Sequence, residues 1–250
     1  YRNAPAGFDA SWTTQGPGNI GARINTIAVH PDNEDIMYAG FSSGGVFKTT
    51  DGGQNWTPIF DDQAFTAIGD VVIDPHDSET IYVGTGDHNI SGFPFIGDGV
   101  YRSRDGGESW EYIGLRDQRI ISKIIVDPND ANTIFVAAMG LPFERNRDRG
   151  LYKTTDGGQT WNQVLFISEQ TGVIDFLMNP ENPQVLFAAG WDRIRNNKES
   201  IVRGDGGNIY RTIDGGQNWE QLTEGLPDSA ITRIGLTMSA QNPNVLYAAY

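Results

Sequence analysis

An eight-residue segment with the pattern [Ser/Thr]-x-Asp-Gly-Gly-x-x-Trp occurs four times and constrains the fold more than any other feature of the chain. The copies begin at residues 49, 103, 154 and 212. Their aspartates are 54, 51 and 58 residues apart, a period typical of solenoids, propellers and arrays. Because a repeat protein builds one continuous core, residues 1–250 are predicted to form a single region.

Each repeat contains four segments with the composition of short β-strands, called a to d here. Strand a is an almost continuous apolar run, predicted to be buried on both faces, at residues 24–29, 68–73, 120–126, 173–178 and 231–238. Strand b follows a polar turn, at residues 36–39, 81–84, 134–138, 185–189 and 245–249. Strand c alternates in polarity just before the motif, and strand d begins at the motif tryptophan.

Four short antiparallel strands repeated around an axis make a β-propeller. The predicted fold class is therefore all-β, with four full four-stranded blades and a partial fifth. The blades are expected at about residues 20–60, 66–114, 118–166, 171–223 and 230–250, the last being partial, and residues 11–16 could supply a closing strand d. This count predicts that the chain is a fragment of a larger propeller.

The repeated turn holds four aspartates, yet its spacing favours a structural role over a catalytic one. An aspartate at the start of a turn can accept backbone N–H groups two or three residues later, and the paired glycines supply positive φ angles. The tryptophan then buries about 150–250 Å². The structural residues of these Asp boxes are Asp51, Trp56, Asp105, Trp110, Asp156, Trp161, Asp214 and Trp219.

Composition and charge exclude several classes of function. A net charge of −14 argues against a nucleic-acid partner, and no apolar run approaches the ~18 residues of a membrane span, so no membrane insertion is expected. The chain has no cysteine and no Asp-x-Asp-x-Asp-Gly loop, so no metal and no cofactor are predicted. A turn-rich composition with 31 glycines fits a secreted or cell-surface protein.

The Asp boxes resemble those of the BNR or Asp-box propeller superfamily. That group includes bacterial sialidases, xyloglucan-type glycosidases, sortilin (VPS10) ectodomains and a photosystem assembly factor. The full pattern, with an I-x-x-I-A-V-x-P strand, a Y-V-G strand and a G-V-Y-K-T-T-D-G-G-x-x-W hairpin, looks most like bacterial sortilin-type repeat proteins often labelled glycosyl hydrolases. The resemblance implies the fold rather than an activity, because this scaffold hosts both enzymes and binding proteins.

Function is expected on the face opposite the Asp boxes. In a four-stranded meander the a–b and c–d turns share one face, and the b–c and d–a loops share the other. The b–c loops vary most in length, spanning residues 41–44, 85–98, 140–149 and 190–207. Eight of the 18 basic residues lie on this loop face: Arg116, Arg119, Arg145, Arg147, Arg149, Arg193, Arg195 and Arg203.

These arginines alternate with acids and with the aromatic residues Phe93, Phe95 and Phe143. Guanidinium groups can take carboxylates bidentately, and aromatic rings can stack on sugars or hold a peptide. The alternative is that arginine and aspartate simply pair across neighbouring loops. The predicted ligand-binding residues are Asp87, His88, Arg119, Arg145, Arg147, Trp191, Asp192, Arg193 and Arg195.

The resemblance also implies two enzymatic alternatives. A sialidase of this superfamily has an Arg-Ile-Pro motif, but Arg23-Ile24 is followed here by Asn25. Xyloglucan-type members place a catalytic aspartate in the first b–c loop, where this chain has Ser42. If the chain is an enzyme, a glycoside hydrolase is expected, and Asp62 and Asp87 are the candidate acids.

The sequence therefore favours a non-catalytic recognition propeller at the cell surface or outside the cell. Its partner is expected to be a protein segment or a polysaccharide, including one with acidic groups. A glycoside hydrolase and a scaffold or assembly factor remain as alternatives.

Overall fold

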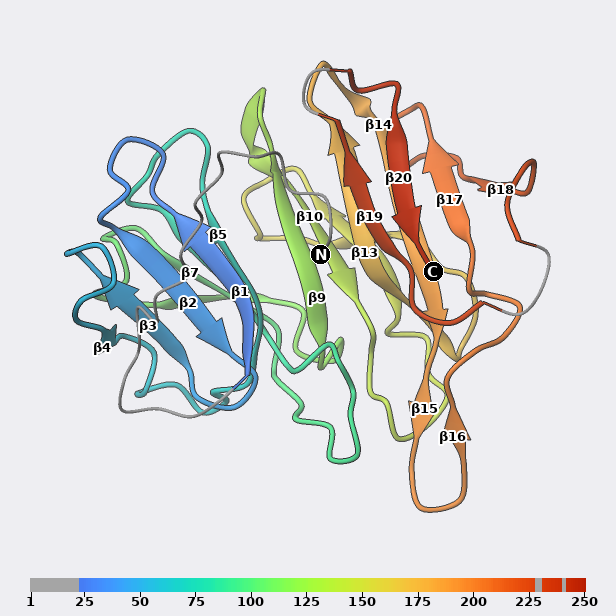
Figure 1. Ribbon diagram of the computed structural model, residues 1–250, viewed down its shortest axis with the longest axis horizontal. Helices are drawn as coiled ribbons and strands as arrows, with labels where there is room; N and C mark the ends of the chain where they lie inside the picture. The colour runs from blue at the N-terminus through green and yellow to red at the C-terminus, as the bar shows by residue number, and fades with distance from the viewer. Residues whose placement is uncertain (1–22, 228–230, 240–241) are drawn as a thin grey trace, which may run out of the picture.

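A computed structural model describes residues 23–227, 231–239 and 242–250, and those residues form only β-strands and loops (Figure 1). Blade 1 contains β1 (Ile24–Val29), β2 (Met37–Phe41), β3 (Val46–Thr49) and β4 (Thr57–Pro58). Blade 2 contains β5 (Ile68–Ile73), β6 (Ile81–Thr85), β7 (Val100–Ser103) and β8 (Glu111–Gly114). Blade 3 contains β9 (Ile121–Asp127), β10 (Asp130–Ala138), β11 (Gly150–Thr154) and β12 (Asn162–Leu165).

Blade 4 differs from the others because a small hairpin interrupts it. Its sheet contains β13 (Thr171–Asn179), β14 (Asn182–Asp192), β17 (Ile209–Thr212) and β18 (Glu220–Leu222). The inserted hairpin is β15 (Ile194–Arg195) and β16 (Ser200–Ile201), which projects beyond the sheets in Figure 1. Two further strands, β19 (Gly235–Met238) and β20 (Leu246–Ala249), pair with each other as the described part of blade 5.

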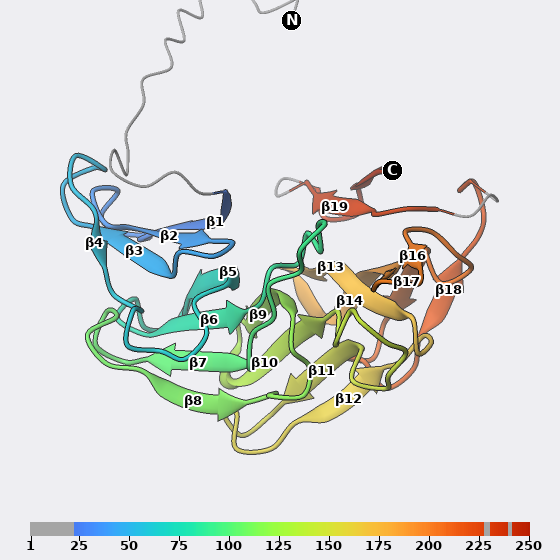
Figure 2. The same cartoon turned by 90° about the horizontal axis from the view of Figure 1, so that it is seen from below.

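The blades follow one another in an arc, with β1, β5, β9, β13 and β19 nearest its centre (Figure 2). Every described sheet is antiparallel, and strands a to d are neighbours in sequence order within each blade. Buried side chains fill the space between successive sheets, as Tyr82 and Val100 of blade 2 do against Ile134 of blade 3. The predicted β-propeller architecture, with four full blades and a partial fifth, is confirmed.

Some details differ from the sequence prediction. Strand β1 is not buried on both faces, since Ile27 is 57% and Val29 is 51% exposed; blade 2 packs against one face of the sheet, and these alternate residues lie on the other. Strand β19 begins at Gly235 rather than at residue 231, where Ile231 forms only an isolated bridge to Gly204. The proposed closing strand at residues 11–16 lies outside the described residues.

The Asp-box turns are held by one hydroxyl group and one carboxylate. In the first box, the Thr49 hydroxyl donates to Asp51 Oδ1 at 2.8 Å and accepts the Gly53 N–H at 3.0 Å. Asp51 Oδ1 also accepts the Asn55 N–H at 2.9 Å, so the bond spans four residues rather than the two or three predicted. The other three boxes repeat this pattern, and both glycines of each box have positive φ angles.

Two of the motif tryptophans join neighbouring blades. The indole N–H of Trp110 donates to the carbonyl of Ile59 at 2.7 Å, and that of Trp161 donates to the carbonyl of Ile113 at 2.8 Å. Each acceptor belongs to the preceding blade. These contacts join blade 1 to blade 2 and blade 2 to blade 3.

A second cross-blade contact was not anticipated from the sequence. A basic residue near the end of strand c donates to a glycine carbonyl in the next blade's Asp box, at 2.8 Å from Lys48, 3.0 Å from Arg102 and 3.1 Å from Lys153. The signal lies in the sequence, because a lysine or arginine directly precedes the first residue of every box.

Aspartates on the inner strands tie blades together near the axis. Asp70 of blade 2 accepts the Thr26 hydroxyl of blade 1 at 2.9 Å and the Ile124 N–H of blade 3 at 2.8 Å. Asp175 of blade 4 likewise accepts the Leu236 N–H of blade 5 at 2.8 Å. Burial raises the pKa of Asp70 to about 6 despite these bonds.

Candidate functional site

The loops that join strands b to c and d to a lie together on one face, as expected. The Gly45 N–H donates to the Thr66 carbonyl at 2.8 Å, and the Gly86 N–H donates to the Ala67 carbonyl at 2.7 Å. On the other face the Asp-box turn contacts the a–b turn of its own blade, where the Gly52 N–H donates to the Asp35 carbonyl at 3.1 Å. The Asp boxes therefore do not line the same surface as the long loops.

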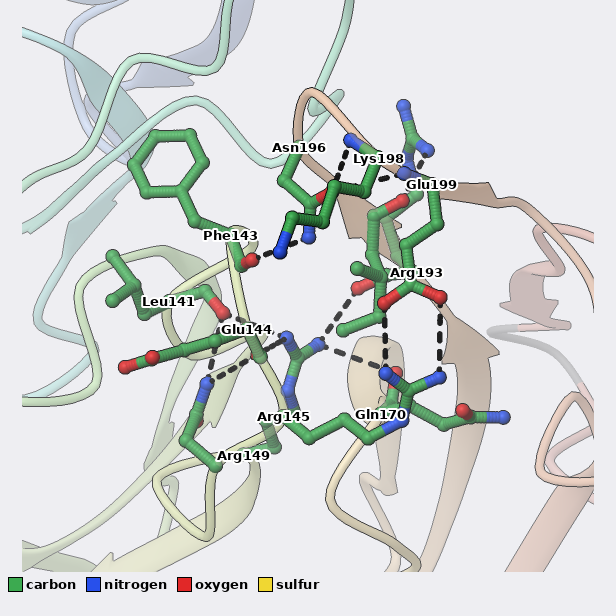
Figure 3. A network of polar contacts seen from close by, with 12 residues as sticks. Leu141, Phe143, Glu144, Arg145, Arg149, Gln170, Arg193, Asn196, Lys198 and Glu199 are labelled. Atoms are coloured by element: carbon green, nitrogen blue, oxygen red, sulfur yellow. Dashed lines mark hydrogen bonds and ion pairs between the residues drawn. The ribbon is translucent and has the colours of Figure 1, made fainter.

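Arg149 is the largest fully buried side chain described, with an exposed fraction of 0%. Its guanidinium donates to four backbone carbonyls in three loops, those of Leu141, Glu144, Gln170 and Arg193, at 2.7 to 3.2 Å (Figure 3). Burial lowers the pKa of Arg149 to about 10. This arginine holds loops of blades 3 and 4 together.

Arg193 has a similar role at the start of the β15–β16 hairpin. Its guanidinium donates to the carbonyl of Ile90 in the blade 2 loop at 2.5 Å and to that of Ile201 in the hairpin at 3.0 Å. The side chain is 6% exposed. Its bonds run to backbone carbonyls and one serine hydroxyl, so this arginine contributes to loop structure. It forms no ion pair with an aspartate among the described residues, so the Arg–Asp pairing considered in the sequence analysis does not hold for Arg193.

The two candidate catalytic acids have different environments. Asp87 is buried and ion-paired with Arg23, and it accepts hydrogen bonds from Asn25 at 3.1 Å and from the Asn89 N–H at 3.1 Å. Burial opposes ionisation, but the bonds from Arg23, Asn89 and Asn25 outweigh it and hold the pKa of Asp87 below its usual value. Asp62 is exposed in the loop between β4 and β5.

His88 faces the axis of the arc. It lines a hollow of about 200 Å³ together with Asp70, Lys123, Asp175 and Arg233. Burial, followed by the charge of Arg233, lowers the pKa of His88 to about 4, so the ring is neutral at pH 7. Its Nδ1 atom is buried without a hydrogen-bond partner among the described residues.

Trp191 and Asp192, at the end of β14, are also buried. The indole N–H of Trp191 donates to the Val202 carbonyl at 2.9 Å, and its ring lies 5.6 Å from the guanidinium of Arg193. Asp192 accepts the Thr171 hydroxyl and the Gly206 N–H, the latter at 3.0 Å. Both side chains are thus buried and hold the blade 4 loops through hydrogen bonds to other residues of those loops.

The side chains of three further predicted arginines contact neighbouring residues. Arg145 pairs with Glu199 at 2.7 Å, whereas Arg119 and Arg147 lie over phenylalanine rings, at 5.3 Å from Phe65 and 4.3 Å from Phe166. The Arg145 pair joins neighbouring loops, as in the alternative of Arg–Asp pairing, but its acid is a glutamate. The two ring contacts involve no acid.

Arg195 lies in a hollow of the loop face. This space of about 740 Å³ is lined by Gly92, Phe93, Pro94, Phe143, Arg195, Asn196 and Asn197. Phe93 is 85% and Phe143 is 40% exposed, so two aromatic rings from different blades face solvent there. The predicted site residues are therefore not brought into one constellation, and Arg195 is the one that lines this hollow.

Several residues of this face were missed by the sequence prediction. Asn196 and Asn197 lie in the β15–β16 turn, whose short strands show no alternation long enough to recognise. The sequence does not place Phe93 and Phe143 in one site, because only the fold brings the loops of blades 2 and 3 together. Asn25, Asn89 and Arg23 carried no signal as partners of Asp87.

Other site types have no support in the described part of the chain. Residues 23–227, 231–239 and 242–250 contain no group of three or more His, Asp or Glu side chains placed to hold a metal ion. Over the same residues, no helix is long and apolar enough to cross a membrane.

Curated relatives of the chain are xyloglucanases. Xyloglucanase Xgh74A of Acetivibrio thermocellus is 23% identical over 96% of this chain and 30% of its own length. The xyloglucanase of Hypocrea jecorina is 28% identical over 64% of this chain and 20% of its own. A probable oligoxyloglucan-reducing end-specific xyloglucanase of Neosartorya fischeri is 32% identical over 79% and 27%. The chain thus spans less than a third of the length of these relatives.

Solved structures with the same fold include GH74 enzymes. An ancestral GH74 enzyme superposes with a TM-score of 0.66 at 23% identity, covering 85% of this chain and 27% of that one. The GH74 xyloglucanase from Xanthomonas campestris gives a TM-score of 0.59 at 21% identity, with coverages of 81% and 30%. The chain therefore matches part of a GH74-type propeller.

The model of the Sortilin-Vps10 family, described as "Sortilin, neurotensin receptor 3", matches residues 98–249. That span covers blades 3 and 4, the described part of blade 5 and the Asp box of blade 2, and it exceeds half of the chain. The chain belongs to the Sortilin-Vps10 family.

Proposed function

We propose that the chain is a non-catalytic recognition propeller that binds a polysaccharide through its loop face, outside the cell or at its surface. The observation that supports this most is the hollow between Phe93 and Phe143, where two solvent-facing rings flank polar side chains. The apolar face of a sugar ring packs on an aromatic ring, while amide and guanidinium groups bond its oxygens. The xyloglucanase relatives act on a polysaccharide, which favours this ligand class over a protein segment.

Binding to a panel of plant and host polysaccharides in affinity electrophoresis tests the proposal. Phe93→Ala and Phe143→Ala should each weaken retardation by the bound glycan at least several-fold. Tyr247→Ala is the matched control, because this exposed tyrosine lies on β20 rather than on the loop face. Absence of retardation by any glycan, or equal loss in the control, would reject the proposal.

Glycoside hydrolysis is the second candidate, supported by the similarity to xyloglucanases over most of the chain. The environments of the acids favour binding instead. Asp87 is buried beside Arg23 with a lowered pKa, which suits a carboxylate and not a proton donor, and Ser42 occupies the position of the loop aspartate of xyloglucan-type members. Reducing sugar released from xyloglucan by the chain, and abolished by Asp87→Asn or Asp62→Asn, would establish the hydrolase.

A further inference from the structure

Arg195 stands apart from the other arginines around the hollow. Arg145 is neutralised by Glu199, and the guanidinium groups of Arg149 and Arg193 are surrounded by carbonyls. Within the described residues the guanidinium of Arg195 makes no hydrogen bond, ion pair or ring contact. It lines the hollow, and its Nη2 atom would lie 3.9 Å from a Cβ atom added at Gly92.

The positive charge at this position is reinforced by its neighbour. Arg193 is buried two residues away without a carboxylate partner, and burial, together with the charge of Arg195, lowers the pKa of Arg193. The nearby acid Glu199 is bound to Arg145. A protein with a net charge of −14 thus presents an uncompensated cationic side chain in this hollow.

The walls of the hollow are tied to one another before any ligand binds. Asn196 Nδ2 donates to the Phe143 carbonyl at 2.8 Å (Figure 3). The Arg195 N–H donates to the Pro142 carbonyl at 2.7 Å. Arg193 joins the same hairpin to Ile90 in the loop that carries Phe93. A preformed site loses little conformational entropy on binding.

We propose that this hollow binds a uronic acid residue of an acidic polysaccharide, with Arg195 taking the carboxylate and Phe93 and Phe143 packing against the sugar ring. The inference rests on the proposed polysaccharide-binding function and adds the ligand's charge. A guanidinium fork matches a carboxylate bidentately, whereas a neutral sugar offers no charge to compensate Arg195. The asparagine amide of Asn197 supplies further hydrogen-bonding capacity at the rim.

Calorimetric titration of the chain with four probes tests this assignment. The probes are tetragalacturonate, a neutral xyloglucan heptasaccharide, a sulfated carrageenan tetrasaccharide and a short poly-glutamate peptide. Tetragalacturonate should bind tightest and weaken as salt is added. Arg195→Gln should lose about tenfold in its affinity, which corresponds to ~1.4 kcal/mol, and Arg195→Lys should lose less because it keeps the charge without the fork.

Arg104→Gln is the matched control, because Arg104 is exposed in an Asp-box turn on the opposite face and should leave tetragalacturonate affinity unchanged. Thermal melts of both variants check that they are folded. Unchanged tetragalacturonate affinity in Arg195→Gln overturns the inference, as does binding of only the sulfated sugar or only the peptide. Binding of the neutral heptasaccharide alone overturns it while leaving the proposed function standing, and failure of every glycan rejects both.

Discussion

The indole N–H of Trp161 in blade 3 donates a 2.8 Å hydrogen bond to the carbonyl of Ile113 in β8 of blade 2. Trp161→Phe should therefore lower the free energy of unfolding by about 1–2 kcal/mol, because it leaves that carbonyl without its donor. Urea denaturation measures the change. Trp219→Phe is the comparison, since Trp219 bonds within its own turn; an equal loss in both would show that the cross-blade bond has no special weight.

Lys153 provides the second type of cross-blade contact, donating to the Gly215 carbonyl at 3.1 Å. Lys153→Met keeps the aliphatic stem and removes the donor, so we expect a loss of about 1 kcal/mol in the free energy of unfolding. Lys198→Met, at an exposed position of the β15–β16 turn, should change it by less than about 0.5 kcal/mol. If the two variants unfold at the same urea concentration, the contact does not stabilise the fold.

The repeat made most of the fold predictable. The bounds of β1 and β5 agree with the predicted strands, because their apolar runs end at clear turn signals, and the loop face follows from the meander. The site was harder to predict because the sequence does not show which of the loop arginines are buried. Arg149 and Arg195 look alike in the sequence, yet one is enclosed by carbonyls and the other lines a hollow. Nothing local distinguishes them, since the carbonyls belong to loops of two blades.

Arg149 should be essential to the order of the loop face. Arg149→Met removes four donors and leaves buried carbonyls unpaired, which should cost at least about 3 kcal/mol in the free energy of unfolding. Hydrogen exchange should also accelerate in residues 140–149 and 193–201. Arg147→Met, at an exposed position of the same loop, is the control and should affect neither quantity strongly; similar exchange in the two variants would contradict the role given to Arg149.

The Asp boxes should make the fold sensitive to acid. Hydrogen bonds from Thr154 and Thr160 lower the pKa of Asp156 from 3.8 to about 2. A carboxylate whose folded pKa is depressed stabilises the fold above its unfolded pKa, and this contribution disappears as the pH falls from about 4 to about 2. Urea denaturation from pH 5 to 2 should show a shallower decline for Asp156→Asn than for the unmodified chain. Parallel curves would rule out this source of acid sensitivity.

His88 should make the stability of the fold depend on pH in a higher range than the Asp boxes do. Its folded pKa of about 4 lies below the ordinary 6.5, so the unfolded state binds a proton first and stability is lost as the pH falls from about 6.5 to 4. His88→Gln should remove this dependence. His30→Gln, which changes a half-buried residue at the turn after β1, should keep it. Direct titration of the ring by NMR gives an independent check, and an ordinary pKa there would contradict the expectation.

The cross-blade bonds from Lys48, Arg102 and Lys153 all point the same way along the chain, from strand c of one blade to the Asp box of the next. These three bonds consequently have a direction along the chain. A substitution that distorts one Asp box removes the carbonyl acceptor from the lysine or arginine of the preceding blade. The bond from the substituted blade's own lysine or arginine to the following blade is retained. A substitution in an Asp box should therefore destabilise the blade on its N-terminal side, and its effect should be looked for one repeat earlier in the chain.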